Sequence, residues 1–504
     1  MNVTYKIRVN RPCKLFIDQE ETQILDELDL VKIQLPKGEY LRKVISIDDS
    51  SIFDEAIIVL DGSSKIDIIT LDTKGLDAAK ANALPNTKFK IGNMYYQASI
   101  DKKSVVLVDP EHPFRYSGDI SIPENINYAG YTYKVTHICH KAFYNAYSLN
   151  SVSISNTIES IEDMVFEGCN SLTAISFGTG LRSIGPRAFR GCSLLKSISL
   201  PQSVNDIEEE AFAYCGLDSI IIPQGVMYIG KRAFMGCHSL QIVSISHTVT
   251  TVKNGAFRDC SSLSSIIIES DNSHYDCRNS CNAIIKTDTN TLIAGCKNTK
   301  IPKDVRHIQE EAFWGIKDLT CINLPESLIS IGAYAFSCCE SLKSIIIPNL
   351  VEEIGEHAFS MCSALESIIV KENNSIYDSR ENSNAIIETK SNTLIVGCKN
   401  SIIPCSVIKI GKAAFCGSKQ LLNIKIHNNI THIEDSAFGW CDAMKSIYLP
   451  NTIKKIGMHA FYRCNSETLN VYYGDTIENW NLIVKGYLWE QKSITRIHCI
   501  DGEI

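Results

Sequence analysis

Four residues near position 280 carry side chains that could bind a metal ion. Cys277 and Cys281 are four residues apart, with His274 before them and Cys296 after them. Thiolates and imidazoles at such spacings are typical ligands of structural zinc. A second copy of this segment lies 102 residues further along, and its corresponding residues are Ile376, Ser379, Ser383 and Cys398. Because the copy keeps only one of the four candidate ligands, we predict neither a metal site nor a cofactor.

The other reactive residues form no recognisable catalytic pattern. The sequence lacks a phosphate-binding Walker loop, a dinucleotide-binding glycine pattern, His-Glu-x-x-His and Gly-x-Ser-x-Gly. Cys139 and His140 are adjacent, but they lie beside a repeated hydrophobic position, where cysteine packs as a small apolar residue. We therefore predict that the protein is not an enzyme. A hydrolase within the two insertions described below is the least favoured alternative.

The composition excludes further classes of protein. The chain has 504 residues, 44% of them hydrophobic and 21% charged, with a net charge of −8. A negative balance disfavours nucleic acid as a partner, because nucleic acid selects a basic surface. No apolar run approaches the ~18 residues that a transmembrane helix needs. The first residues lack the features of a secretory signal, which predicts either a cytoplasmic location or a leader that has been removed.

The strongest pattern in the chain is a repeat of twelve phenylalanines. They are separated by 22 or 23 residues, apart from two steps of 56. A fixed period of this length indicates a solenoid, in which each repeat forms one coil stacked on the last. The anchors are Phe143, Phe166, Phe189, Phe212, Phe234, Phe257, Phe313, Phe336, Phe359, Phe415, Phe438 and Phe461.

Other positions recur around each phenylalanine. Ile or Val stands five residues earlier and is often followed by glycine, as at Gly185 and Gly332, where we expect a turn with positive φ. Alanine usually precedes the phenylalanine, and this segment predicts a helical or 3₁₀ turn. An alternating trio such as Ile198-Ser-Leu predicts a short strand with two inward residues and one outward residue. Strands of successive coils should pair in parallel around a core of stacked anchors.

Nine cysteines also follow the repeat, each three residues after an anchor. Alanine, isoleucine or serine takes this place in the other three coils, which is typical of a small buried position. We expect reduced core thiols; the alternative is disulfides between neighbouring coils. These residues are Cys169, Cys192, Cys215, Cys237, Cys260, Cys339, Cys362, Cys441 and Cys464.

The two 56-residue steps each contain 33 more residues than the usual 23, near 269–301 and 371–403. Both insertions share the order Tyr-Asp, Asn-Ala-Ile-Ile, Asn-Thr-Leu-Ile and Gly-Cys-Lys-Asn. We expect each to form a two-stranded excursion that bulges from one side of a coil and then rejoins the repeat. Such bulges are a candidate recognition surface.

The repeated pattern Leu-x-x-Ile-x-Ile/Leu-Pro, followed by Val/Ile-x-x-Ile-Gly-x-x-Ala-Phe-x-x-Cys, resembles the BspA-like, or Treponema pallidum-type, leucine-rich repeat from about Tyr131 to Cys464. The segments 116–123 and 471–480 resemble the family's flanking pieces. The resemblance implies a curved, right-handed α/β leucine-rich repeat solenoid with short parallel strands. It also implies adhesive or protein-binding roles, usually on the surface of host-associated bacteria or protozoan parasites. The missing export signal departs from that location.

These patterns divide the chain into five parts. We expect a small all-β, sandwich-like module at 1–72, which weakly resembles a PEGA-type accessory domain but lacks its four-residue motif. A linker at 73–92 and a cap at 93–136 should precede the repeats at 137–464. A second cap should occupy 465–504. Caps are required because an open solenoid end exposes apolar residues and strand edges.

The outward residues of the predicted strands form the candidate binding surface. Isoleucine at four places, together with a tyrosine, is more apolar than a solvent-facing row requires, although strand propensity also favours isoleucine. We predict a non-enzymatic protein-binding or adhesion protein with a protein partner, such as a host or cell-surface protein. The alternative is a passive scaffold that presents the amino-terminal module. The candidate residues are Ser176, Ser199, Ile221, Ser244, Ile267, Asn323, Ile346, Ile369, Lys425 and Tyr448.

Overall fold

A computed structural model describes most of the chain as two compact units. The first contains Met1–Pro110 and Pro123–Ile138, and the second contains Glu111–Ile122 and Cys139–Ile504. The described residues are 2–9, 13–17, 20–25, 30–36, 38–46, 53–60, 65–69, 83–85, 87–100, 102–110, 115–464, 469–489 and 494–504.

The first unit is formed mainly from strands. Two of its sheets have the orders β4-β1-β7 and β3-β2-β5-β6, and β8, β9 and β10 pair antiparallel. The expected all-β amino-terminal part is present, while its sandwich packing and its likeness to a PEGA-type domain stay predictions. Most of the expected linker lies outside the described residues. The strands are β1 (Asn2–Val9), β2 (Cys13–Ile17), β3 (Glu20–Leu25), β4 (Leu30–Pro36), β5 (Gly38–Ser46), β6 (Phe53–Leu60), β7 (Lys65–Ile69), β8 (Phe89–Ile91), β9 (Met94–Ala98), β10 (Ser104–Val108), β12 (Asn125–Tyr128) and β13 (Tyr131–Ile138).

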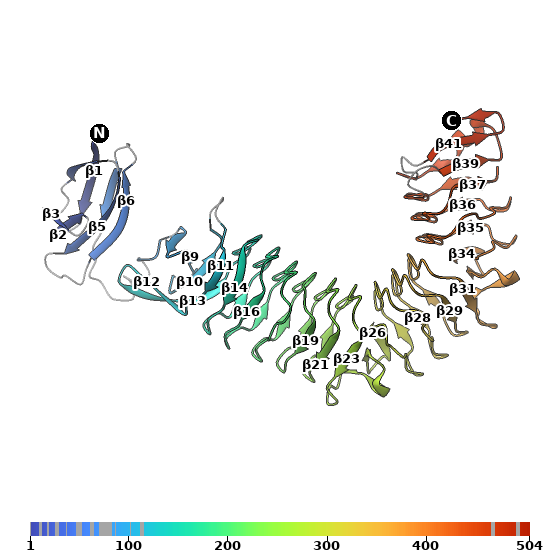
Figure 1. The fold of residues 1–504 in the computed structure, drawn as a ribbon, viewed down its shortest axis with the longest axis horizontal. Helices are drawn as coiled ribbons and strands as arrows, with labels where there is room; N and C mark the ends of the chain where they lie inside the picture. The colour runs from blue at the N-terminus through green and yellow to red at the C-terminus, as the bar shows by residue number, and fades with distance from the viewer. Residues whose placement is uncertain are drawn as a thin grey trace. The chain divides into compact units, whose positions relative to one another are not determined.

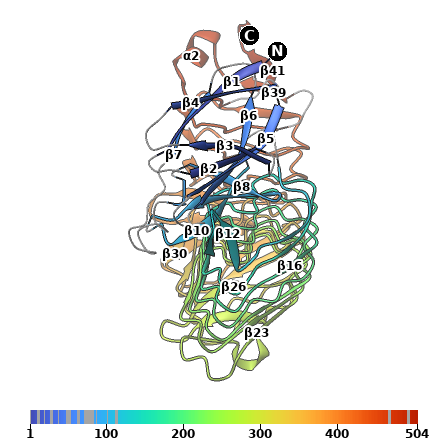
Figure 2. The same ribbon diagram turned by 90° about the vertical axis from the view of Figure 1, so that its left-hand side faces the viewer.

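The second unit is the predicted solenoid, with one coil for each repeat (Figures 1 and 2). On one face, strands of three to five residues pair in parallel and keep equivalent residues side by side, as in Ile220↔Val243↔Ile266. These strands are β11 (Gly118–Ser121), β14 (Leu149–Ser153), β16 (Ala174–Ser176), β19 (Ser219–Ile222), β21 (Ile242–Ile245), β23 (Ser265–Ile268), β29 (Ser344–Ile347), β31 (Ser367–Val370) and β37 (Ser446–Leu449).

A second face carries strands of two residues, again paired in parallel. Each ends at the Ile or Val that precedes an anchor by five residues, as in Ile184↔Ile207↔Ile229. They are β15 (Ser160–Ile161), β17 (Ser183–Ile184), β18 (Asp206–Ile207), β20 (Tyr228–Ile229), β22 (Thr251–Val252), β27 (His307–Ile308), β28 (Ser330–Ile331), β30 (Glu353–Ile354), β35 (Lys409–Ile410), β36 (His432–Ile433) and β38 (Lys455–Ile456).

The core consists of columns of identical side chains that run through the stack. All twelve anchor phenylalanines are buried, and those 22 or 23 residues apart stack with ring centroids 4.9–5.6 Å apart. The ladder cysteines are buried free thiols, which confirms the prediction of reduced core residues. Each thiol donates to the backbone carbonyl oxygen of the anchor in the preceding coil, as Cys192 does to Phe166 at 3.3 Å. Disulfides between neighbouring coils, the alternative, do not form.

Two local predictions are wrong. The glycine that follows the Ile does not need positive φ; it is required because the backbone of the preceding coil is close. A Cβ built on Gly355 would lie 2.3 Å from the backbone nitrogen of Ala333. Positive φ occurs instead two residues before and after each anchor, as at Arg187 (56°) and Gly191 (79°).

The Ala-Phe segments form successive turns instead of the expected helical or 3₁₀ turn. Alternate backbone N–H groups bond within the coil and to the next coil, as in Ala188 N to Gly185 O at 3.2 Å and Phe189 N to Ala211 O at 2.7 Å. This alternation explains the left-handed residues, because each one turns the next N–H group towards the neighbouring coil. The stack is therefore held by backbone hydrogen bonds on this side as well as by the strands.

Each insertion forms an excursion that rejoins the repeat, as predicted, but with three short antiparallel strands instead of the expected two. In the first, β24 (Tyr275–Asp276), β25 (Ala283–Lys286) and β26 (Thr291–Gly295) pair antiparallel, and β26 then pairs in parallel with β27. The second has β32 (Tyr377–Asp378), β33 (Ile386–Glu388) and β34 (Thr393–Val396) in the same arrangement. On the anchor side the coils stack directly, because Asp259 N donates to Trp314 O at 2.8 Å.

Aromatic residues close both ends of the phenylalanine column. Tyr116 packs on Phe143 at 4.5 Å, and Trp489 packs on Phe461 at 6.3 Å. The carboxyl-terminal segment contributes β39 (Leu469–Tyr473), α2 (Ile477–Leu482), β40 (Val484–Lys485), β41 (Ile494–Cys499) and β42 (Gly502–Glu503). Within the described residues, the structure contains no helix that is both long enough and apolar enough to span a membrane.

Candidate binding surface

The ten candidate binding residues, from Ser176 to Tyr448, are called the row below. The row lies on the longer-strand face of the second unit, and nine of its ten residues are exposed. Ser244, in β21, is half-buried. The exposed fractions of the large apolar side chains are 70% for Ile221, 51% for Ile267, 48% for both Ile346 and Ile369, and 61% for Tyr448. Side chains exposed to this extent are accessible to a binding partner.

Hydrogen-bonded pairing divides the row into groups instead of one continuous sheet face. Ile221, Ser244 and Ile267 are in register on β19, β21 and β23. Ile346 and Ile369 are opposite each other on β29 and β31. The breaks fall at the two insertions and at the coils of Ser199 and Asn323, which form no strand at this place.

Ser176, Ser199 and Asn323 occupy the same outward position with polar side chains. Ser176 lies on β16 and donates to Ser153 at 3.2 Å. Ser199 and Asn323 lie on coils that form no strand at this place. The apolar part of the row is therefore limited to the middle and carboxyl-terminal coils.

Two aromatic residues that the sequence analysis missed extend the row. Tyr448 stacks on Tyr472 at 4.6 Å, and Tyr472 stacks on His498 at 4.5 Å. On the other side of Tyr448, the backbone of Lys425 forms an isolated parallel β-bridge with that of Tyr448. The alternation of Leu469-Asn-Val-Tyr-Tyr was a signal for this extension, because Tyr472 takes the outward place of the strand. The carboxyl-terminal end of the row is thus an aromatic stack on β37, β39 and β41.

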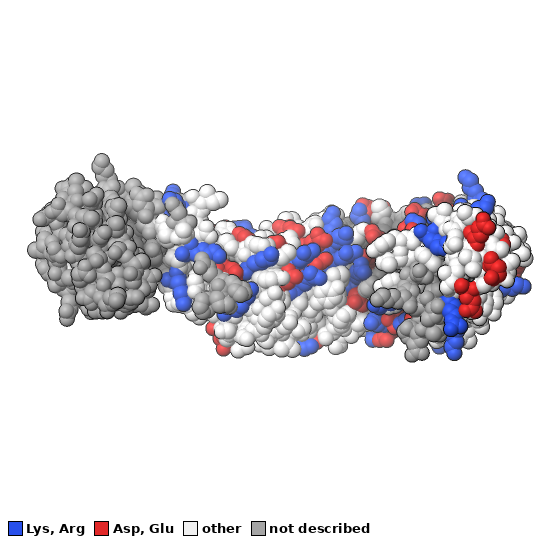
Figure 3. Space-filling model, turned by 90° about the horizontal axis from the view of Figure 1, so that it is seen from above, with Lys and Arg blue, Asp and Glu red and all other residues white. Residues whose placement is uncertain are grey.

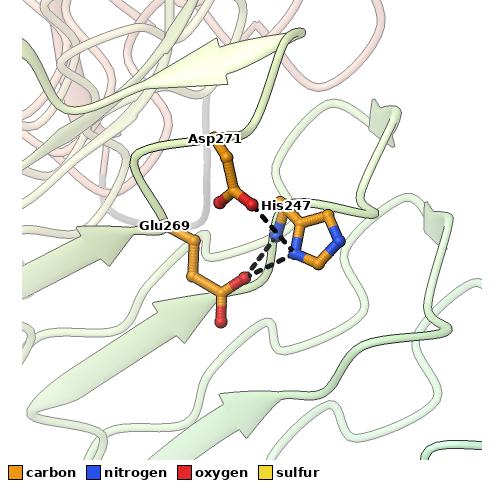
Figure 4. Close-up of side chains that lie close together, drawn as sticks. All are labelled: His247, Glu269 and Asp271. Carbon is orange, nitrogen blue, oxygen red and sulfur yellow. Dashed lines mark hydrogen bonds and ion pairs between the residues drawn. The ribbon is translucent and has the colours of Figure 1, made fainter.

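A cluster of His247, Glu269 and Asp271 lies beside this face in the first half of the solenoid (Figure 4). His247 Nδ1 is 2.8 Å from Glu269 Oε2 and 3.7 Å from Asp271 Oδ2. Hydrogen bonding to Glu269 raises the pKa of His247, and the same contact lowers the pKa of Glu269. All three residues are at least partly exposed. The corresponding residues of the duplicated block are Asn349, Lys371 and Asn373.

The cluster is best described as an exposed ion pair with a second carboxylate nearby. Sequence reasoning missed it because His247 and Glu269 are 22 residues apart, and only stacking of the coils brings them together.

The cysteines that suggested zinc do not gather into a ligand set. In the described part of the chain, the His247 cluster is the only group of three or more potential ligands within reach of one another. Cys281 donates to Cys277 with 3.8 Å between the sulfur atoms, whereas Cys296 donates to Asn282 O at 3.4 Å. The bond from Cys281 lowers the pKa of Cys277 to about 6. This half-buried thiol is therefore a nucleophile near neutral pH.

Both insertions are held by the same arginine clamp. Arg278 binds the carboxylate of Asp276 at 2.7 Å and Asn290 Oδ1 at 2.8 Å. Arg380 binds Asp378 and Asn392 in the same way. The insertions are therefore fixed excursions, and as a second candidate surface they stay a prediction.

Acidic and basic side chains are interspersed on the face shown in Figure 3. Neighbouring coils pair them, as in Arg190–Glu167 at 3.3 Å and Arg187–Glu210 at 3.2 Å. A surface built in this way presents no large field of one sign on that face, so a partner there would not be selected by its net charge.

The comparisons with known proteins agree with this architecture. The sequence profile of the BspA type leucine rich repeat region matches the chain in six copies, over residues 123–241, 205–296, 283–397 and 395–481. The match covers more than half of the chain, which therefore belongs to the BspA-type leucine-rich repeat family.

Several solved structures are similar to the chain. A leucine-rich cell surface protein from Faecalibacterium prausnitzii is 24% identical, with a TM-score of 0.49, covering 79% of this chain and 97% of its own. A leucine-rich repeat protein from Bacteroides ovatus is 24% identical, with a TM-score of 0.44 and coverages of 82% and 99%. The pneumococcal vaccine antigen PcpA is 16% identical, with a TM-score of 0.42 and coverages of 82% and 98%. No curated protein sequence matches the chain.

Proposed function

We propose that this chain is a non-enzymatic binding or adhesion protein that holds another protein on the longer-strand face of its solenoid. The observation that supports this function is that five coils carry a large apolar side chain, about half exposed or more, at the same outward place. Membership of the BspA-type leucine-rich repeat family is consistent with such a role.

Covering the apolar side chains of the row would contribute a useful part of the binding free energy of a partner. Covering the exposed half of one isoleucine removes roughly 80 Å² of apolar surface from water, worth about 2 kcal/mol. Ile346 and Ile369 lie in register, so one partner segment could cover both. Strand propensity favours isoleucine and tyrosine alike, so the alignment of these side chains, and not their type, supports a partner site. We expect a partner that offers an apolar strip flanked by hydrogen-bonding groups.

A matched pair of triple variants tests this function. In the test variant, Ile346→Lys, Ile369→Glu and Tyr448→Asp place charges in the row. In the control variant, the same three side chains replace Leu350, Ile402 and Leu422, which are 53%, 64% and 60% exposed but lie outside the row. Proteins captured by the wild type from host cell lysates and culture media are identified, and their affinities for all three forms are then measured.

We expect the test variant to lose at least tenfold in affinity, the control to bind like the wild type, and all three to unfold at similar temperatures. If the test variant bound as tightly as the wild type, the row would not be the binding surface. If every captured partner bound both variants as tightly as the wild type, the solenoid would be better described as a spacer that presents the amino-terminal module.

A further inference from the structure

The phenylalanine column is interrupted where the coil of Phe359 meets the coil of Phe415. Phe359 stacks on Phe336 at 5.3 Å, but in the described part of the chain no ring pair joins it to Phe415. Phe415 instead lies against Gly397, whose Cβ, if it had one, would be 2.2 Å from the ring. The second insertion has thus taken the place of one rung of the column, and a cavity of about 340 Å³ remains beside Phe359.

The first insertion creates the same junction 102 residues earlier, but large side chains fill it. Glu311 is 2% exposed and binds Arg232 at 2.6 Å and also Arg258. The guanidinium of Arg258 lies 3.8 Å from the ring centre of Trp314. In the second junction the corresponding residues are smaller. The first-junction residues and their counterparts are Arg258 and Ser360, Glu311 and Ala413, and Trp314 and Cys416.

The opening at the second junction is left by these three shortened side chains, while His357, which stands in the place of Gly255, occupies part of the space. Both junctions keep the glycine that packs on the next anchor and the backbone hydrogen bond from it, Gly295 N to Ala312 O and Gly397 N to Ala414 O. A space of this size would otherwise hold roughly ten water molecules at ~30 Å³ each. It also falls within the range of small-molecule sites, which begin at about 300 Å³.

The walls of the cavity combine an apolar floor with a few neutral polar groups. Phe359 and Cys362 are buried in the floor, and His357 and Ser360 contact each other at 3.2 Å in the wall. Burial lowers the pKa of His357, so its imidazole is neutral at physiological pH. The charged groups at the opening are of both signs.

Two of those charged residues, Glu356 and Lys412, pair with each other at 2.9 Å. The other lining charges, Glu388, Lys409 and Glu434, are also mixed in sign. A charged ligand would have to lose its hydration without gaining a clear counter-charge, so a neutral ligand is favoured.

We propose that this cavity binds a neutral, flat heteroaromatic molecule of one or two fused rings, which takes the place of the missing rung against Phe359. The anchor column provides the reason for a flat ring, because anchors of consecutive coils with no insertion between them stack at about 5 Å. Ring nitrogens of the ligand would pair with the imidazole of His357 and the hydroxyl groups of Ser360 and Thr393. This site is distinct from the exposed row, and the proposal does not depend on the proposed protein partner.

The first junction supplies the variant that tests the site. Ser360→Arg and Cys416→Trp transfer the stacked arginine and tryptophan of the first junction, Arg258 and Trp314, to the second junction. Cys416→Trp alone is a milder second variant. Indole, quinoline and adenine are the probes, with glucose as a non-aromatic comparison, and binding to the full chain is measured by saturation-transfer NMR and calorimetry.

We expect at least one aromatic probe to bind the wild type saturably, and both folded variants to bind it at least tenfold more weakly. Thermal unfolding of each variant shows whether it is folded. No saturable binding of any aromatic probe up to about 1 mM would overturn the proposal. Unchanged affinity in a folded variant, or binding of glucose in preference to the aromatic probes, would overturn it as well.

Discussion

Replacing single anchor phenylalanines by leucine should reveal how the column stabilises the solenoid. Phe336 stacks on Phe313 at 5.0 Å and on Phe359 at 5.3 Å, so it has a ring on both sides. Phe359 has a stacked ring on one side and the cavity on the other. Leucine conserves most of the apolar volume, so the comparison isolates the ring contacts.

The expected magnitudes follow from the number of stacked pairs. An aromatic pair contributes about 0.5–1.5 kcal/mol beyond its buried area. Phe336→Leu removes two pairs and should cost about 1–3 kcal/mol, whereas Phe359→Leu removes one and should cost about half of that. The difference arises although both side chains are buried, at 0% and 5% exposed.

Hydrogen exchange is the suitable assay, because the stability of a solenoid is distributed over neighbouring repeats and a single melting temperature could hide a local change. Each 1.4 kcal/mol of lost stability raises the exchange rate of the protected amides about tenfold. Amides of the turn after Phe336 should therefore exchange several-fold faster in Phe336→Leu than the matching amides do in Phe359→Leu. Equal changes, or a larger change at Phe359, would refute the additive stacking argument.

Three further predictions concern charged and reactive groups. Cys277 should be the thiol that limiting iodoacetamide modifies first at pH 7, and Cys281→Ala should slow that reaction by removing the hydrogen bond that stabilises the thiolate; peptide mapping that finds Cys281 modified first would contradict this. The lowered pKa of His357 means that the unfolded chain binds more protons than the folded chain, so the free energy of unfolding should fall as the pH falls below about 6.5. In denaturant titrations, His357→Asn should flatten this dependence on pH. An unchanged dependence would count against burial of His357 as the cause. Glu311→Gln should cost about 3–5 kcal/mol because it leaves two arginines without their buried partner, whereas Glu326→Gln at an exposed pair should cost less than about 1 kcal/mol, both measured by guanidinium unfolding; similar costs would show that burial does not matter here.

The coil could be predicted from the sequence, because twelve segments share the same pattern of residues at a nearly constant period. Phe189 and its counterparts had to share an environment, and a stacked column is the environment that a period of 23 residues provides. The parallel strands and the reduced cysteines followed from the same argument. The two insertions were recognisable because each is a copy of the other.

Features that depend on contact between coils could not be predicted from one repeat. The glycine at Gly355 indicates a turn in the sequence, yet its cause is the backbone of the preceding coil. Positive φ falls on Arg187 and Glu210, residue types that give no signal for it. Turn conformation here is set by hydrogen bonds to the next coil, which override the local preference of the side chain.

The candidate site was predicted in part for the same reason. The outward place of each strand follows from alternation, so Ile346 and Tyr448 could be named from the sequence. The His247 and Glu269 pair joins adjacent coils and required the stack to be seen. The cavity beside Phe359 required knowledge that the two junctions pack in the same way, since only then do shorter side chains imply an opening.

Photo-crosslinking tests the central functional claim most directly. A benzophenone amino acid is placed at Ile346 or Tyr448 in the row, and at Ile402 or Leu422 outside it, since all four positions are similarly exposed. We predict that light joins a captured partner to the row positions and leaves the two outside positions unlinked. Crosslinks from Ile402 and Leu422 alone, or equally from all four positions, would show that the partner binds elsewhere.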